Sequence, residues 1–233
     1  MPRSMRPKMC RWSRRSSPAK ANWRADMRLI LARHGNTFGP EDRVIWVGAR
    51  SDLPLVGKGR AQAAAIGKAL LSRGMVPTRI HAGPLQRTVQ TAAIAAEAMG
   101  LCAAALTIAP ELREIDYGCW EGRSNAEIRA AHGDRAIDGW QQDSRFPQGF
   151  GWSPPEGEIR AQWQAFLARL QLDREETVLV VSSNGIYRVI AQGFGIPAAA
   201  AKMDTGALSV LHFSQDRIAV ACWNTAPGDL PHS

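Results

Sequence analysis

Polar side chains that could handle a phosphate group stand directly after four short apolar runs of this sequence. Segment 27–33 is followed by HGNT and carries the neighbours Arg33 and His34 at its end. Arg87 comes shortly after segment 79–82, and Glu114 comes shortly after segment 104–109. Segment 177–182 ends in the turn SSNG, residues 182–185. Ligands of open α/β sheets bind beyond the carboxyl ends of the strands, so we expect these groups to converge.

The residue types in this set suit a phosphate monoester. The planar guanidinium of arginine matches the oxygens of a phosphoryl group. A neutral imidazole can attack phosphorus and form a phosphohistidine. A carboxylic acid can protonate the departing oxygen. Two arginines, one histidine, one carboxylate and a polar turn therefore predict phosphoryl chemistry at one edge of a sheet.

The elements that must position these residues alternate between strand and helix. Short apolar runs predict strands at 27–33, 79–82, 104–109 and 177–182, and apolar periodicity predicts helices at 57–71, 84–99, 157–172 and 185–194. Segments 207–213 and 217–223 predict a strand pair joined by a tight turn. This order indicates a three-layer α/β/α sandwich with a mostly parallel, mixed sheet that finishes in an antiparallel pair.

One long irregular stretch interrupts this alternation. Residues 111–158 are rich in glycine, tryptophan, aspartate and proline, and we expect one or two short helices near 124–141. Irregular insertions of this length often cover an active site. We therefore expect a single domain at 27–233 with a lid-type insertion at about 123–155.

The positive charge of the chain belongs to its first residues. The formal net charge is +8, yet residues 1–26 hold eight of the 29 basic residues and only one of the 21 acidic residues. We expect these residues to be a disordered basic extension, or translation from an upstream start, because Met27 opens the first predicted strand and is a natural beginning. The Arg- and Ser-rich extension also weakly resembles an organelle transit peptide. The nearly neutral remainder makes nucleic-acid binding an unlikely function.

Other features of the composition exclude further classes of protein. No apolar run is long enough for a membrane span. The four cysteines show no metal-binding spacing, so we expect reduced thiols and a cytoplasmic location. The sequence leaves the oligomeric state open, a dimer included.

Several ordered motifs resemble the histidine phosphatase superfamily, also called the phosphoglycerate-mutase-like family. LARHGNT is similar to its RHG signature, and DLPLVGKGRAQA (52–63) is similar to D-x-x-L-T-x-x-G-x-x-Q-A. GPLQRTVQTA (83–92) resembles S-x-L-x-R-x-x-Q-T-A, and LREIDYGCWEG (112–122) resembles L-x-E-x-x-Y-G-x-W-E-G. PPEGE (154–158) resembles the segment that opens the next helix. The resemblance covers roughly residues 27 to 223, essentially the whole predicted fold.

The resemblance implies a role for each matching residue. His34 would be the phosphorylated nucleophile, and Glu114 would give a proton to the leaving group and then activate water. Arg33 and Arg87 would hold the phosphoryl group. The loop residues Asn36 and Thr37 would touch phosphate or substrate, or cap the turn. The family implies a phosphorylated small-molecule substrate, no cofactor and no metal ion.

The turn after segment 177–182 departs from the family pattern. Alignment of VVSSNGIYR with VVSHGGxxR puts Ser183 where the family has a second catalytic histidine, followed by Asn184. Loss of one donor to transition-state charge typically costs about 10²–10³-fold in rate. We therefore expect a phosphatase of reduced or specialised activity, with Ser183 and Asn184 still beside the phosphate.

Two competing functions remain open at this point. A catalytically impaired member of the fold could bind a phosphorylated ligand without hydrolysis. A phosphoglycerate-type mutase is disfavoured because the YGCWEG segment lacks the longer, basic insertion of the mutases. We expect substrate specificity to lie in residues 40–51 and 123–155. The candidates there are Arg43, Trp46, Arg50, Arg123, Arg145 and Trp152.

Overall fold

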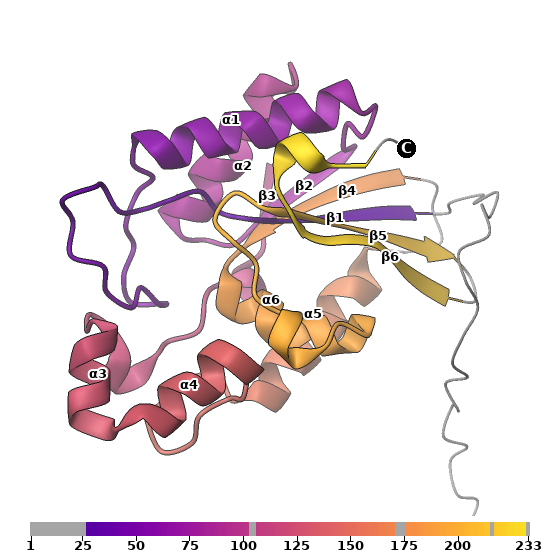
Figure 1. Ribbon diagram of the computed structural model, residues 1–233. Helices are drawn as coiled ribbons and strands as arrows, with labels where there is room; N and C mark the ends of the chain where they lie inside the picture. The colour runs from indigo at the N-terminus through magenta and orange to yellow at the C-terminus, as the bar shows by residue number, and fades with distance from the viewer. Residues whose placement is uncertain (1–26, 103–105, 171–175, 215–216, 232–233) are drawn as a thin grey trace, which may run out of the picture.

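A six-stranded mixed sheet forms the centre of the protein (Figure 1). The computed structural model describes residues 27–102, 106–170, 176–214 and 217–231. The strand order across the sheet is β3-β2-β4-β1-β5-β6. The strands are β1 (Met27–Arg33), β2 (Arg79–Ala82), β3 (Leu106–Ile108), β4 (Glu176–Ser182), β5 (Leu208–Ser214) and β6 (Arg217–Thr225).

Helices cover both faces of this sheet, as the sequence predicts. In Figure 1, α1 and α2 lie above the sheet, whereas α5 and α6 lie below it. The α-helices are α1 (Gly57–Ser72), α2 (Gln86–Ala98), α3 (Asn125–His132), α4 (Asp134–Asp143), α5 (Glu156–Arg169) and α6 (Asn184–Ala191). Short 3₁₀ helices span Pro110–Leu112, Gly118–Trp120, Gln192–Phe194, Ala198–Ala200 and Pro227–Asp229.

Strand pairing fixes the edge at which the polar residues meet. Strands β3, β2, β4 and β1 run parallel, and β5 runs antiparallel to both β1 and β6. Arg33, the last residue of β1, pairs with Ser182, the last residue of β4. The backbone N–H of His34 then donates to the carbonyl of Ser182 at 3.1 Å. The polar ends of two strands are thereby held side by side.

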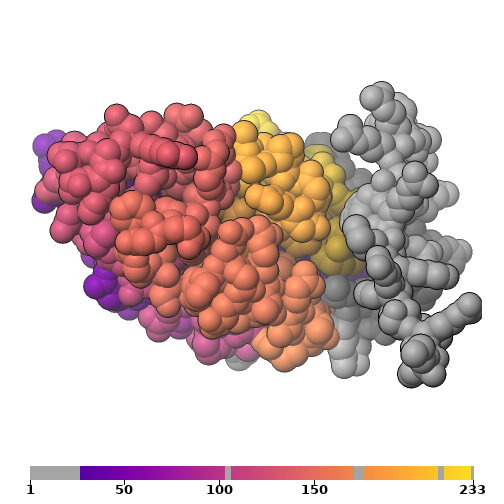
Figure 2. Space-filling view, turned by 90° about the horizontal axis from the view of Figure 1, so that it is seen from below, coloured from indigo at the N-terminus to yellow at the C-terminus, as the bar shows by residue number. Residues whose placement is uncertain are grey.

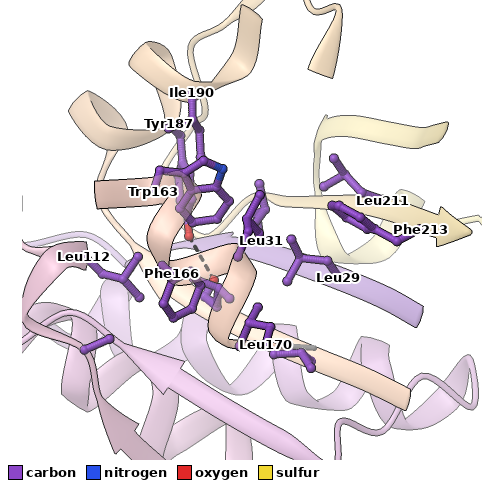
Figure 3. Packing of buried hydrophobic residues seen from close by; sticks show 14 of the residues in the cluster. Leu29, Leu31, Leu112, Trp163, Phe166, Leu170, Tyr187, Ile190, Leu211 and Phe213 are labelled. Carbon is purple, nitrogen blue, oxygen red and sulfur yellow. Dashed lines mark hydrogen bonds between the residues drawn. The ribbon is translucent and has the colours of Figure 1, made fainter. Parts of the chain in front are cut away.

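The alternation of side chains along β1 creates a core on each face of the sheet. Leu29 and Leu31 point toward α5 and α6, where Trp163, Phe166 and Tyr187 pack (Figure 3). The other face buries Ile30 and Ala32 of β1 against α1 and α2, through residues that include Ile66, Leu70, Ala92 and Ala95. The Tyr187 hydroxyl is satisfied in this core because it donates to the carbonyl oxygen of Val180 at 2.8 Å. Both faces are buried, as a parallel sheet requires.

The predicted elements are found at nearly the predicted positions. The helix predicted to open at Pro84 begins at Gln86, because Leu85 is still extended (φ −81°, ψ 144°). The helix predicted over 185–194 is divided into α6 and the 3₁₀ turn that follows it. The basic extension 1–26 and part of the predicted 214–216 turn lie outside the described residues.

Residues 123–155 hold two short helices, α3 and α4, over a cluster of aromatic side chains. Ser124 and Glu127 form a capping box at the start of α3, and Gly133 separates the two helices with a φ of 76°. Trp120, Trp140 and Trp152 pack edge to face beneath them. This segment forms a large part of the surface seen from below in Figure 2. No helix among the described residues is long and apolar enough to cross a membrane.

Candidate active site

The loop after β1 is held in place by glycines and one glutamine of α1. A Cβ atom on Gly35 would lie 2.8 Å from the carbonyl carbon of Gly59, so only two glycines permit this approach. The Gln62 side chain accepts from the backbone N–H of Asn36 at 2.8 Å and donates to the carbonyl of Thr205 at 2.8 Å. The spacing G-x-x-Q of the sequence motif therefore positions the loop that carries His34.

His34 is oriented for attack through Nε2. The side chain is buried, and Nδ1 lies 2.8 Å from the carbonyl oxygen of Gly35. A carbonyl only accepts hydrogen bonds, so Nδ1 carries the proton and Nε2 keeps its lone pair. Burial, followed by the nearby cations Arg33 and Arg87, lowers the pKa of His34 well below 6.5. The imidazole is therefore neutral near pH 7.

Two guanidinium groups flank the histidine. Arg87 is fully buried on the first turn of α2, and its Nη1 and Nη2 donate to the carbonyls of Ser51 (2.7 Å) and Gly48 (3.1 Å). Nη1 of Arg33 donates to the carbonyl of Met203 at 2.6 Å. The Nε atoms of both arginines have no hydrogen-bond partner within the described part of the chain. Each cation thus retains donor capacity for an anion.

Glu114 is a buried carboxyl held by backbone donors. Its two oxygens accept from the N–H groups of Ile115 (2.9 Å) and Gly185 (3.3 Å). Burial raises the pKa of Glu114 above 4.5, although Arg87 and the backbone hydrogen bonds act in the opposite direction. A carboxyl with a raised pKa in a buried site suits the role of proton donor.

Tyr117 is a site residue to which the sequence analysis assigned no role. Its hydroxyl is hydrogen-bonded to Glu114, and burial and the Glu114 charge raise the pKa of the phenol well above 10. The hydroxyl therefore stays protonated and donates to the carboxyl. The signal for this residue was the tyrosine of the YGCWEG motif, but spacing alone does not indicate what the hydroxyl contacts.

The polar turn after β4 contributes unequally to the site. Asn184 lines the cleft that also contains His34, and its Oδ1 accepts from the N–H of Met203 at 3.0 Å. Ser183 is fully buried, and its hydroxyl has no hydrogen-bond partner within the described residues. Ser183 is not among the residues that line this cleft. The structure thus brings Asn184, but not the Ser183 hydroxyl, to the surface of the cleft.

The cleft has a volume of about 690 Å³ and collects most of the predicted residues. Of the predicted set, Arg33, His34, Asn36, Thr37, Arg87, Glu114 and Asn184 line it. The Asn36 amide donates to the carbonyl of Phe38 at 2.8 Å, which shapes the loop. The remaining lining residues are Phe38, Gly39, Val44, Ile45, Trp46, Val47, Tyr117, Asn125, Trp140, Gln141, Arg188, Lys202 and Thr205.

Trp46 is the one predicted specificity residue that lines this cleft. Arg43 forms an ion pair with Glu127, Arg50 with Asp116 and Glu121, and Arg145 with Asp143. Trp152 is buried in the aromatic cluster. The Arg123 side chain is exposed, and the backbone carbonyl of Arg123 accepts a hydrogen bond from the N–H of Trp46. Within the described residues, no three histidine, cysteine, aspartate or glutamate side chains gather in a way that could hold a metal ion.

The sequence pattern of the histidine phosphatase superfamily (branch 1) matches residues 29–226. A 2,3-bisphosphoglycerate-dependent phosphoglycerate mutase of Sphingopyxis alaskensis is 32% identical over 138 residues, 58% of this chain and 56% of that protein. This match thus spans little more than half of the relative. A probable phosphoglycerate mutase of Erwinia tasmaniensis is 31% identical over 175 residues, 74% of this chain and 77% of that protein.

Solved structures share the fold. A mycobacterial glucosyl-3-phosphoglycerate phosphatase superposes with a TM-score of 0.70 at 23% identity, covering 85% of this chain and 99% of that one. A putative alpha-ribazole-5'-P phosphatase of Escherichia coli superposes with a TM-score of 0.65 at 27% identity, covering 86% and 98%. The α/β fold predicted from the sequence is therefore confirmed.

Proposed function

The chain belongs to the histidine phosphatase superfamily, and we propose on this premise that it hydrolyses a phosphate monoester through a phosphohistidine on His34. The observation that carries the proposal is the hydrogen bond from His34 Nδ1 to the Gly35 carbonyl, 2.8 Å long. It leaves Nε2 unprotonated in a cleft that also contains Arg33, Arg87 and Glu114. Nucleophile, anion-binding groups and proton donor thus share one cavity.

In the first step Nε2 of His34 attacks phosphorus. The bond from phosphorus to Nε2 forms as the bond to the alcohol oxygen breaks, and Glu114 gives its proton to that oxygen. Arg33 and Arg87 neutralise the charge on the three other phosphoryl oxygens. The products of this step are the free alcohol, phosphohistidine and an ionised Glu114.

In the second step water replaces the histidine. The Glu114 carboxylate takes a proton from water while the water oxygen attacks phosphorus and the bond to Nε2 breaks. Inorganic phosphate leaves, and Glu114 and His34 return to their starting protonation states. The hydrogen bond that Tyr117 donates to Glu114 keeps the carboxyl aligned through both steps. No metal ion takes part in this proposed route.

We further propose that the activity is reduced or specialised and that residues 123–155 act as a cover over the cleft. The buried, unpartnered Ser183 hydroxyl supports the first point because it leaves the second-histidine position without a donor at the cleft surface. Trp140 and Asn125 of α4 and α3 line the cleft and support the second. In our proposal Asn184, rather than Ser183, supplies the polar contact from this turn. A cytoplasmic location remains a prediction.

Transient phosphorylation of His34 is the direct test. Phosphohistidine is acid-labile, so the protein should be quenched at alkaline pH after mixing with a generic aryl phosphate and then analysed by mass spectrometry. We expect an adduct on His34 that is absent from His34→Ala. Binding of phosphate without any adduct or phosphate release would favour the alternative of a non-hydrolytic ligand-binding protein.

A phosphoglycerate mutase is the second alternative function. It is supported by the two relatives described above, which are named as phosphoglycerate mutases. A phosphoglycerate mutase must move a phosphoryl group between two positions of one substrate. The test is to incubate the enzyme with 3-phosphoglycerate and look for both the 2-isomer and inorganic phosphate. We expect phosphate release without isomerisation, whereas isomerisation faster than release would establish the mutase.

A further inference from the structure

One wall of the cleft is built from a run of apolar side chains. The four consecutive residues Val44, Ile45, Trp46 and Val47 all line it. Val44 is 67% exposed, and the other three are partly buried. Ligand-binding sites commonly combine apolar side chains with a few polar groups, as this cleft does.

Trp46 fixes this wall in place. Its backbone N–H donates to the carbonyl of Arg123 at 2.9 Å, and its indole N–H donates to Asn125 Oδ1 at 2.8 Å. Its ring packs edge-on against Tyr117 and Trp120, with centroids 4.9 and 5.0 Å apart. The wall is thus joined to the cover segment and to the residue that contacts Glu114. A wall held in this way is formed before a ligand arrives.

The apolar surface continues on both sides of this run. Phe38 and Trp140 line the same cleft. A second hollow of about 410 Å³ adjoins the cleft, and Val44, Ile45 and Trp46 line both. The remaining residues around the second hollow are Ser124, Asn125 and Ala126. An elongated apolar group that leaves the phosphate site therefore has a continuous surface to follow.

Two of the four cations that line the cleft, Arg188 and Lys202, contact other groups of the protein. Arg188 donates to the carbonyls of Trp140 (2.8 Å) and Gln141 (3.0 Å) and to the hydroxyl of Ser144 (2.7 Å). Lys202 pairs with Asp204 at 2.9 Å. Arg33 and Arg87, the other cations of the lining, flank His34 and belong to the phosphoryl end. Each cation of the described lining therefore either has a polar partner already or belongs to the phosphoryl end, and the exposed Lys202–Asp204 pair is the weakest of these contacts.

We propose that this cleft takes phosphate monoesters of uncharged, apolar alcohols and discriminates against alcohols that carry a carboxylate. The inference rests on the proposed hydrolysis at His34 and identifies the class of leaving group. Apolar area removed from water would contribute to binding, whereas a carboxylate against Val44 and Ile45 would lose its hydration without gaining a partner.

A matched pair of substrates tests the inference. Hexyl phosphate and 6-phosphonooxyhexanoate have equivalent phosphoester oxygens and differ only in the remote carboxylate. We expect kcat/KM for phosphate release to be at least about tenfold higher for hexyl phosphate, in line with the discrimination that apolar pockets achieve. An equal or higher value for the carboxylate compound would overturn the inference and leave the proposed hydrolysis intact.

A charge placed on the wall should reverse this preference. In Val44→Lys we expect the ratio of the two kcat/KM values to fall by at least about tenfold, since the lysine can pair with the carboxylate. The control is Leu71→Lys on α1, an exposed apolar residue outside the cleft at 50% exposure. We expect its ratio to match that of the wild-type protein. An unchanged ratio in Val44→Lys would contradict a role for this wall.

Binding measurements separate the inference from catalysis. Heptylphosphonate and 7-phosphonoheptanoate cannot be hydrolysed, and calorimetry gives a Kd for each. We expect the same order of preference, whether or not the chain releases phosphate from the esters. Absence of phosphate release combined with tighter binding of heptylphosphonate would contradict only the proposed hydrolysis. Failure of both phosphonates to bind would overturn the inference as well.

Discussion

Gly59 of α1 touches the backbone of Asn36 so closely that no side chain fits between them. A Cβ atom on Gly59 would lie 2.7 Å from the Asn36 nitrogen and closer still to its carbonyl oxygen. The loop that carries His34 is therefore shaped by the absence of a side chain on the neighbouring helix. The loop that carries His34 therefore requires a glycine at position 59 of α1, 25 residues later in the chain.

Replacement of Gly59 should damage the site through this contact. In Gly59→Ala we expect the loop to move, the free energy of unfolding to fall by about 1–3 kcal/mol, and kcat/KM to fall at least about tenfold. Denaturant unfolding and phosphate release provide the two measurements. The control is Gly57→Ala, because nothing lies within 4 Å of a Cβ there. An alanine at Gly57 should leave activity unchanged and stabilise the helix by about 0.4–1 kcal/mol.

The rate of hydrolysis should be highest at acidic pH. His34 must be neutral, so activity is lost as pH falls through its pKa, which burial places well below 6.5. Glu114 must be protonated, so activity is lost as pH rises through its pKa, which burial raises above 4.5. The profile of kcat/KM against pH is the measurement.

The variant Glu114→Gln tests whether the loss of activity at higher pH comes from ionisation of the Glu114 carboxyl. We expect a loss of about 10²–10⁴-fold at the optimum, because general acid catalysis typically contributes that much. The ratio of wild-type to variant kcat/KM cancels any titration of the substrate, and it should decline as pH rises. A ratio that stays constant across pH would show that Glu114 is not the proton donor.

The hydroxyl of Ser183 should contribute little to the reaction. It is buried and unpartnered, so Ser183→Ala removes a polar atom that receives no hydrogen bond from the described residues. We expect kcat/KM to change by less than about twofold, and stability to be unchanged or to rise by about 1–3 kcal/mol. A tenfold loss of activity would instead show that this hydroxyl contacts the phosphoryl group during turnover.

A histidine at position 183 tests whether the missing donor limits the rate. We expect Ser183→His to raise kcat toward about 10²-fold where the imidazole reaches the cleft, since one donor to the transition state is typically worth that much. Overpacking at this buried position would cost about 1–3 kcal/mol, so thermal unfolding must be followed in parallel. A folded variant with no gain in kcat would contradict the proposal that activity is reduced at this turn.

Arg188 should couple the cover segment to α6. Arg188→Met leaves the carbonyl of Gln141 without its side-chain donor and removes one of the two donors to the carbonyl of Trp140, which still accepts from the N–H of Ser144. Loss of a donor to a buried group costs about 1–3 kcal/mol. We expect a lower Tm by calorimetry and increased hydrogen exchange in α4. Arg135→Met, an exposed arginine on the same helix, should leave both measurements unchanged. Equal effects of the two variants would contradict this coupling.

The fold and the polar residues at the strand ends were predictable from the sequence alone. Short apolar runs with polar ends predicted strands whose carboxyl ends meet at one edge of the sheet. The sequence motifs predicted that Arg33, His34, Arg87 and Glu114 lie at this edge, and all four line the cleft. These predictions succeed because they depend on neighbouring residues in the sequence. Apolar periodicity indicates which faces are buried, and the ends of the apolar runs indicate the edge of a parallel sheet. Asn36, Thr37 and Asn184 line the same cleft, and their contact with phosphate stays a prediction.

Which side chains line the cleft depends on contacts through space that the sequence does not reveal. Ser183 and Asn184 are neighbours, yet Ser183 is buried whereas Asn184 lines the cleft. Ser183 is the single residue between the end of β4 at Ser182 and the start of α6 at Asn184. We predicted Arg43, Arg50 and Arg145 as specificity residues, but each forms an ion pair outside the cleft. The acidic partners of Arg43 and Arg50 are distant in the sequence, and that of Arg145 is two residues away. Ion pairs and burial depend on distances through space, which spacing along a chain does not fix. The apolar wall formed by Val44 to Val47 could not be predicted either. Trp46 holds this wall in place through contacts with residues that lie some 70 to 80 positions later in the sequence.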